Sequence, residues 1–186
     1  MDDGKHEKSL ELCFKLIEKE NPDGYLVAGM NYFELKKYDD AIKYLQGANG
    51  KSNGLSESLL GDIYATKLDE PDIQEALLMF EEAGKQGLIS SLVKLGKIYS
   101  EGQLVSRDLE LAEKWFQKAI EFQYVRDFNR QFDFDKPEAN YYLGLICEEK
   151  GDLKKAIYYL EKSVGSKFAP KDAAVKLKEI KSKKTN

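Results

Sequence analysis

Apolar residues recur along this chain at spacings that place them on one face of an α-helix. The segment 5–20 carries such a stripe, formed by Leu10, Cys13, Phe14 and Ile17, and Asn-Pro-Asp at 21–23 ends this helix and starts the next. Farther along, several alanines are followed after two helical turns by a second small residue. The spacing predicts an all-α chain.

Two short motifs alternate and give the chain an internal repeat. The first is an apolar residue followed directly by glycine and, three residues after the glycine, usually by tyrosine. It occurs as AGMNY (28–32), LGDIY (60–64), LGKIY (95–99) and LGLIC (143–147). The second begins with alanine at residues 41, 76, 112 and 156 and reads AIKYL, ALLMF, AEKWF and AIYYL. Each pair of motifs predicts a helical hairpin, and the hairpins must stack because none can bury its apolar stripe alone.

The glycine of the first motif lies in the middle of a predicted helix, where it is less favourable than alanine by about 1 kcal/mol. Without a side chain it allows the second helix of the same hairpin to approach closely. We therefore predict that Gly29, Gly61, Gly96 and Gly144 lie at the helix crossings within the hairpins.

The four copies resemble tetratricopeptide repeats, and the second and third resemble their Sel1-like relatives. The stretch from Ser90 to Gln123 carries the resemblance most strongly, with Gly102, Val105 and Asp108 in the loop between its two helices. That loop is short in repeats one and four, as in tetratricopeptide repeats, and longer in repeats two and three. The resemblance implies a right-handed superhelical α-α solenoid of about four helical-hairpin repeats with a capping helix at each end.

We expect residues 1–186 to form a single repeat domain. Its parts are an N-terminal capping helix (1–21), repeats one to three (22–53, 54–87 and 88–123), an insertion (124–137), repeat four (138–168), and a C-terminal capping helix with a tail (169–186). The insertion is aromatic. Its Phe128, Phe132 and Phe134 either fold back onto the solenoid or form a second element that recognises a partner.

The resemblance also implies that the first helix of each repeat lines a concave groove. Positions one turn before the glycine, directly after it and one turn beyond it should face the groove, which would be apolar at both ends and polar between them. A peptide or helix of another protein with hydrophobic anchors would suit this surface. The candidate residues are Leu26, Met30, Phe33, Asp62, Lys97, Tyr141, Leu145 and Glu148. The apolar ones could equally belong to the core between repeats.

Composition narrows the choice of partner. The chain has 29 basic and 33 acidic residues, a net charge of -4, and only three arginines, so we expect no nucleic-acid partner. No stretch approaches the apolar length that spans a bilayer, and the start lacks an export signal, so we expect a cytoplasmic protein without membrane association. Cys13 and Cys147 are expected to be buried thiols.

Catalytic chemistry has little to build on in this sequence. His6 is the only histidine and is expected to be solvated, and there is no phosphate-binding glycine loop, so we expect no enzyme, no cofactor and no metal site. The sequence favours a non-catalytic adaptor or scaffold that binds another protein, as a monomer or weak homodimer. The alternative is an immunity- or inhibitor-type protein that neutralises a cognate toxin or enzyme by covering its surface.

Overall fold

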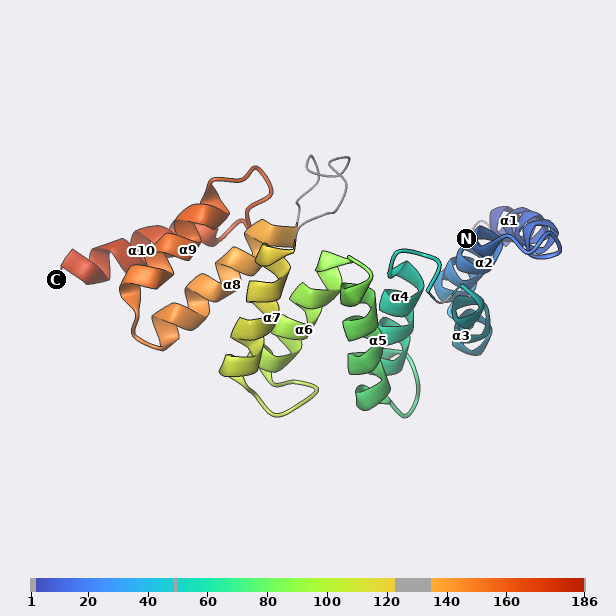
Figure 1. The fold of residues 1–186 in the computed structure, drawn as a ribbon, viewed down its shortest axis with the longest axis horizontal. Coiled ribbons are helices and arrows are strands. Elements are labelled where there is room, and N and C mark those ends of the chain that lie inside the picture. The colour runs from blue at the N-terminus through green and yellow to red at the C-terminus, as the bar shows by residue number, and fades with distance from the viewer. Residues whose placement is uncertain (1–2, 49, 123–134, 186) are drawn as a thin grey trace. The chain divides into compact units, whose positions relative to one another are not determined.

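The structure is a computed structural model that describes residues 3–48, 50–122 and 135–185. Over these residues the chain forms α-helices and no strand, which confirms the all-α prediction (Figure 1). The chain divides into two compact units, residues 1–91 and 92–186. The predicted aromatic residues of the insertion, Phe128, Phe132 and Phe134, lie outside the described residues.

The first unit consists of successive helices that pack on their neighbours in the chain. They are α1 (Asp3–Ile17), α2 (Pro22–Glu34), α3 (Tyr38–Gly47), α4 (Leu55–Thr66) and α5 (Ile73–Lys85), followed by the start of α6 (Ile89–Glu101). Helices α2 and α3 form one hairpin, α4 and α5 form the next, α1 packs on α2, and α3 packs on α4.

The second unit holds the rest of α6 and four further helices. They are α7 (Leu109–Glu121), α8 (Asp135–Glu149), α9 (Leu153–Val164) and α10 (Ala173–Thr185). Helices α8 and α9 form a hairpin, α7 packs on α8, and α10 packs on α9.

The four repeat glycines lie where the two helices of a hairpin meet most closely. A Cβ atom at each of these positions would stand 2.6 or 2.7 Å from a bulky side chain of the second helix. The pairs are Gly29 with Leu45, Gly61 with Phe80, Gly96 with Phe116, and Gly144 with Leu160. All four bulky partners are buried, so they have no room to move away. The predicted crossings are confirmed.

The small residues of the second helices complete this close packing. Each is almost fully buried, and together they let α3, α5, α7 and α9 lie flat against the first helix of their hairpin; they are Ala41, Ala48, Ala76, Ala83, Ala112, Ala119, Ala156 and Ser163. Cys13 and Cys147 are likewise buried, as expected, and burial raises the pKa of both thiols.

Aspartate begins the second helix in three of the four hairpins. Asp72, Asp108 and Asp152 each accept a hydrogen bond of 2.9 to 3.0 Å from the backbone N–H three residues on, which satisfies an otherwise unpaired donor at the helix start. In the first hairpin the corresponding residue is Lys37, which forms no side-chain cap. The start of α3 is therefore the one among these four that lacks this stabilisation.

Helix α1 is held on α2 by hydrogen bonds that sequence reasoning did not foresee. His6 Nδ1 donates to Asn31 Oδ1 at 2.9 Å, and Asn31 Nδ2 donates to Ser9 Oγ at 2.9 Å. The expectation of a solvated His6 is wrong, because the buried amide of Asn31 needs polar partners and α1 supplies them. Gly24 allows the contact, since a Cβ there would lie 2.8 Å from Cys13 O.

The glycine crossings predict the effect of a single methyl group. In Gly96→Ala the new Cβ would meet the buried Phe116 ring, and overpacking of about 1–3 kcal/mol should exceed the gain of about 1 kcal/mol in helix propensity. Urea denaturation should therefore show a lower free energy of unfolding.

Gly165→Ala is the matched control for this substitution. Gly165 ends α9 with a φ of -63°, and a Cβ there would make only ordinary contacts, the nearest at 3.4 Å. We expect no loss of stability in this variant. A Gly96→Ala protein as stable as the Gly165→Ala protein would contradict the assigned role of the glycine.

Candidate partner-binding surfaces

Helix α2 carries a solvent-facing stripe that includes two large apolar side chains. Val27 and Met30, three positions apart on one face, are 39% and 41% exposed. On the same helix Gly24, Ala28 and Asn31 are buried. Met30, which the sequence predicted for the groove, is exposed, and Val27 is an exposed apolar neighbour that the spacing rule did not include.

Leu26 and Phe33 border this stripe on the side of the core. Both are half-buried and pack against a cluster formed by Ala41, Leu45, Leu60 and Ile63. Phe33 also meets the Tyr38 ring edge-on, with 6.0 Å between the ring centroids. Both residues thus serve the core between the first two hairpins while leaving an edge accessible. We call Leu26, Val27, Met30 and Phe33 the α2 surface.

Helix α4 contributes one charged residue of the predicted row. Asp62 is half-buried, and the residues one turn to either side of it on the same face, Ser58 and Ala65, are 7% and 5% exposed. This face of α4 is consequently less exposed to solvent than the α2 surface.

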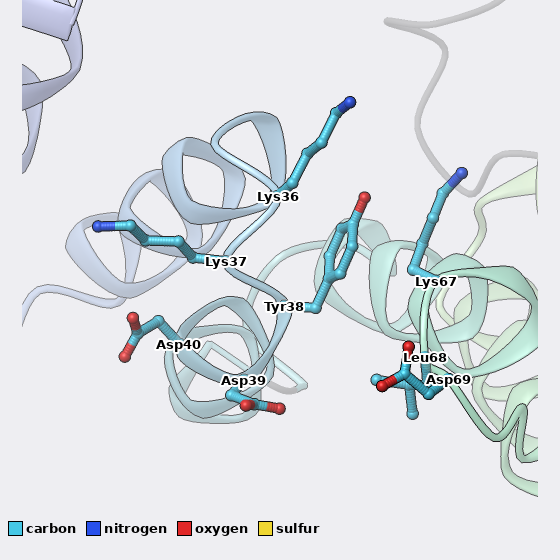
Figure 2. A pocket seen from close by; sticks show the side chains of 8 residues that line it. All are labelled: Lys36, Lys37, Tyr38, Asp39, Asp40, Lys67, Leu68 and Asp69. Atoms are coloured by element: carbon cyan, nitrogen blue, oxygen red, sulfur yellow. The ribbon is translucent and has the colours of Figure 1, made fainter.

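A cleft of about 370 Å³ lies between the turns that end α2 and α4 (Figure 2). Its lining comes from Lys36, Lys37, Tyr38, Asp39 and Asp40 on one side and from Lys67, Leu68 and Asp69 on the other. Tyr38 and Leu68 also pack against the buried cluster, so the cleft is anchored to the core. Sequence reasoning missed it, because its residues lie in loops and in the first turn of α3, outside the repeat motifs.

A buried carboxylate holds the connection between the first two hairpins. Glu57 Oε1 accepts from Gly50 N at 2.6 Å and from Gln86 Nε2 at 2.7 Å, and Oε2 accepts from Ser56 Oγ at 2.8 Å. Burial raises the pKa of Glu57, but these hydrogen bonds outweigh it and the pKa lies below its usual value. The network links the loop after α3 to the end of α5. It thereby holds the connection between the hairpin that contains α2 and the hairpin that contains α4.

In the second unit the predicted charged positions are already engaged within the chain. Lys97 Nζ lies 3.2 Å from Glu138 Oε1 and 5.4 Å from the centre of the Tyr142 ring. Burial lowers the pKa of Lys97, yet the bond to Glu138 outweighs it and the pKa is raised. Lys97 is thus held against α8.

Glu148 is paired with the last helix. Its two carboxylate oxygens lie 2.9 Å from Lys176 Nζ and 2.8 Å from Lys183 Nζ, both on α10. Burial opposes ionisation, but the two lysines hold the pKa of Glu148 below its usual value. Tyr141 packs against the same core cluster as Leu177 of α10, and Leu145 is half-buried.

The part of the chain that the structure describes shows no sign of a metal centre. No group of three or more His, Cys, Asp or Glu side chains among these residues is arranged to hold an ion. Within the same ranges no helix combines the length and the apolar character that crossing a bilayer requires.

Comparison with known proteins identifies the repeats. The Sel1 repeat matches residues 58–88 and 89–121, and the tetratricopeptide repeat matches residues 22–49 and 137–169. Over 81 residues, 44% of its length, the chain is 36% identical to a sel1-like repeat-containing protein of Acanthamoeba polyphaga mimivirus. A crystal structure of a Sel1 repeat protein from Oxalobacter formigenes is similar over 86% of the chain, with a TM-score of 0.66 and 18% identity.

The chain therefore belongs to the tetratricopeptide and Sel1-like repeat family, as its motifs predicted. It spans only 15% of the mimivirus relative and 64% of the Oxalobacter protein. Proteins built from these repeats generally serve as protein-interaction modules and are typically not catalysts.

The Glu57 network predicts a pH-dependent contribution to stability. Its folded pKa lies below the unfolded value near 4.5, so the carboxylate stabilises the fold above that value and loses this effect as the pH falls through the folded pKa. Glu57→Gln should lower the free energy of unfolding by about 1–3 kcal/mol at pH 7, because an amide cannot accept at both positions.

The measurement is urea denaturation of both proteins between pH 7 and pH 3. The difference between wild type and Glu57→Gln should shrink toward the acid end, while the exposed Glu18→Gln control should match wild type throughout. A difference that stays constant with pH would contradict the assignment.

Proposed function

We propose that this chain is a non-catalytic adaptor or scaffold whose α2 surface binds a peptide or helix of a partner protein. The exposure of Met30 carries the proposal. This side chain is 41% exposed although Leu26 and Phe33 beside it pack into the core, so the fold does not consume its apolar surface. An apolar residue fixed on a rigid helix beside a polar cleft has the character of an interface anchor.

The size of the effect can be estimated from the area that a partner would cover. Burying a Met or Val side chain completely contributes about 1.5–3 kcal/mol, and both side chains here begin partly buried. Helix α2 is held by α1, by the α3 crossing and by the core cluster, so little ordering is needed on binding. Two anchors on such a helix suit a short amphipathic segment with apolar residues at matching spacing.

The second unit would add contacts of a different kind. We propose that Lys97, Tyr141, Leu145 and Glu148 form a separate polar contact surface on α6 and α8. Because Lys97 and Glu148 already have partners within the chain, a binding protein has to offer charges that compete with Glu138 or with the lysines of α10. Such contacts affect specificity more than affinity.

The proposal is tested by placing a charge on the α2 surface. Partners captured from the native cell extract by the wild-type chain would be identified by mass spectrometry and then measured against Met30→Glu. A buried, unpaired carboxylate in the interface should weaken binding at least tenfold. Helical circular dichroism should not change, because Met30 is outside the core.

Leu78→Glu serves as the matched control, since Leu78 is an apolar residue of the same unit that is 54% exposed on α5. It should bind the partner as the wild type does. Retained binding by Met30→Glu would refute the α2 surface, and so would equal loss of binding in both variants.

A further inference from the structure

Two lysines of the cleft occupy positions where at least one other repeat has a residue better suited to the local backbone. Lys36 follows the end of α2 with a φ of 59°, in the left-handed region that L-residues with a side chain rarely adopt. Counted from the repeat glycine, the same position in the fourth repeat is Gly151, with a φ of 80°. Glycine adopts this conformation without strain, so at this position lysine is less favourable for the stability of the fold than glycine.

Lys37 departs from the other repeats in the same way. It stands at the start of α3, where Asp72, Asp108 and Asp152 cap the corresponding helices, and it provides no side-chain hydrogen bond there. A cation at a helix start is also opposed by the positive end of the helix dipole. Two neighbouring positions of one repeat thus hold lysine where local stability favours glycine and aspartate.

Local conflicts of this kind concentrate at functional positions, where a side chain that reduces stability is retained for what it binds. Both lysines line the cleft, and Lys67 joins them from the α4 side. Figure 2 shows the ammonium groups of Lys36 and Lys67 and the hydroxyl of Tyr38 extending in the same direction, with the carboxylates of Asp39 and Asp69 lower in the view. The cleft therefore has a basic rim and an acidic rim.

The basic rim has donors to spare. Within the described part of the chain, Lys36, Lys37 and Lys67 form no ion pair, in contrast to Lys97, Lys150 and Lys176 of the second unit. The ammonium groups of Lys36 and Lys67 and the phenol hydroxyl of Tyr38 can donate to an incoming carboxylate, whereas Lys37 extends away from them in Figure 2. The aspartates of the opposite rim repel a long polyanion, so the cleft suits one or two negative charges.

We infer that this cleft binds an acidic side-chain pair in the partner polypeptide, held between Lys36 and Lys67 beside Tyr38. The α2 surface reaches the cleft through Phe33, whose ring meets that of the cleft residue Tyr38 with 6.0 Å between the centroids, so the acidic pair would adjoin the apolar anchors. The inference rests on the proposed function in that the ligand is a polypeptide. It adds the chemistry of that ligand, an apolar stretch adjoining adjacent aspartates or glutamates.

The test uses the full chain labelled with ¹⁵N and a blocked hexapeptide containing two adjacent glutamates. The same peptide with glutamines, and inorganic phosphate, are titrated in parallel. The glutamate peptide should shift the amide resonances of residues 36–40 and 67–69, and the glutamine peptide should not. Absence of these shifts, shifts confined to the lysine-rich segment 171–183, or equal shifts with phosphate would overturn the inference.

Two variants then separate binding from folding, because their effects should have opposite signs. Lys36→Gly relieves the left-handed backbone and Lys37→Asp supplies the missing cap, so neither should lower the melting temperature and either should raise it. Both should weaken binding of the glutamate peptide, by about fivefold for Lys36→Gly, as expected for one exposed ion pair. A lower melting temperature in both, or unchanged affinity, would overturn the inference.

Lys19→Ala removes one positive charge from the same unit outside the cleft and should leave the affinity unchanged. Failure of this inference can be told apart from failure of the proposed function. Met30→Glu tests partner binding through the α2 surface whether or not the cleft takes an acidic group.

Discussion

The close approach of a helix backbone to one bulky side chain is the contact on which each hairpin depends. At Gly29, Gly61, Gly96 and Gly144 the missing Cβ leaves space that Leu45, Phe80, Phe116 or Leu160 fills completely. The contact sets both the distance and the register between the two helices of a hairpin. Once the register is set, it determines which residues of the first helix face the core and which face solvent, and so it places Met30.

Other interactions then join one hairpin to the next. In the first unit the buried Glu57 ties the loop before α4 to the end of α5. In the second unit Arg107 reaches Glu149 through two hydrogen bonds of 2.7 and 2.6 Å, which link the loop before α7 to the end of α8. These connections are polar and differ between the units, whereas the glycine crossing is common to every hairpin. The geometry that the repeats share lies within the hairpins, and the differences between the repeats lie in their loops.

The sequence was sufficient to predict the helices, the hairpin pairing and the crossings, because a glycine inside an amphipathic stretch has few explanations other than close packing. It was not sufficient for exposure along α2. Val27 is open and Leu26 half-buried because α1 and α4 cover different sides of that helix, and neither contact is encoded in the spacing from Gly29. His6 was misjudged for the same reason, since its partner Asn31 lies 25 positions away.

The cleft could not be predicted from the sequence, for a different reason. Lys36 shows its left-handed conformation only in the structure, because glycine, the usual signal of that conformation, is absent there. Likewise the ion pairs of Glu148 depend on where α10 lies, which the lysine-rich composition of residues 171–186 does not specify. Repeat periodicity therefore predicts what the repeats share, and the candidate functional residues of this chain are largely departures from it.

A double-mutant cycle between Gly61 and Phe80 tests the central packing claim most directly. Gly61→Ala, Phe80→Leu and the double variant would be compared by urea denaturation, which reports the free energy of unfolding of each. If the alanine methyl group collides with the Phe80 ring, the smaller leucine makes room for it, and the double variant should be more stable than the sum of the single effects by about 1 kcal/mol or more. Effects that add to within about 0.5 kcal/mol would show that the glycine and the ring do not limit each other, and would contradict the account.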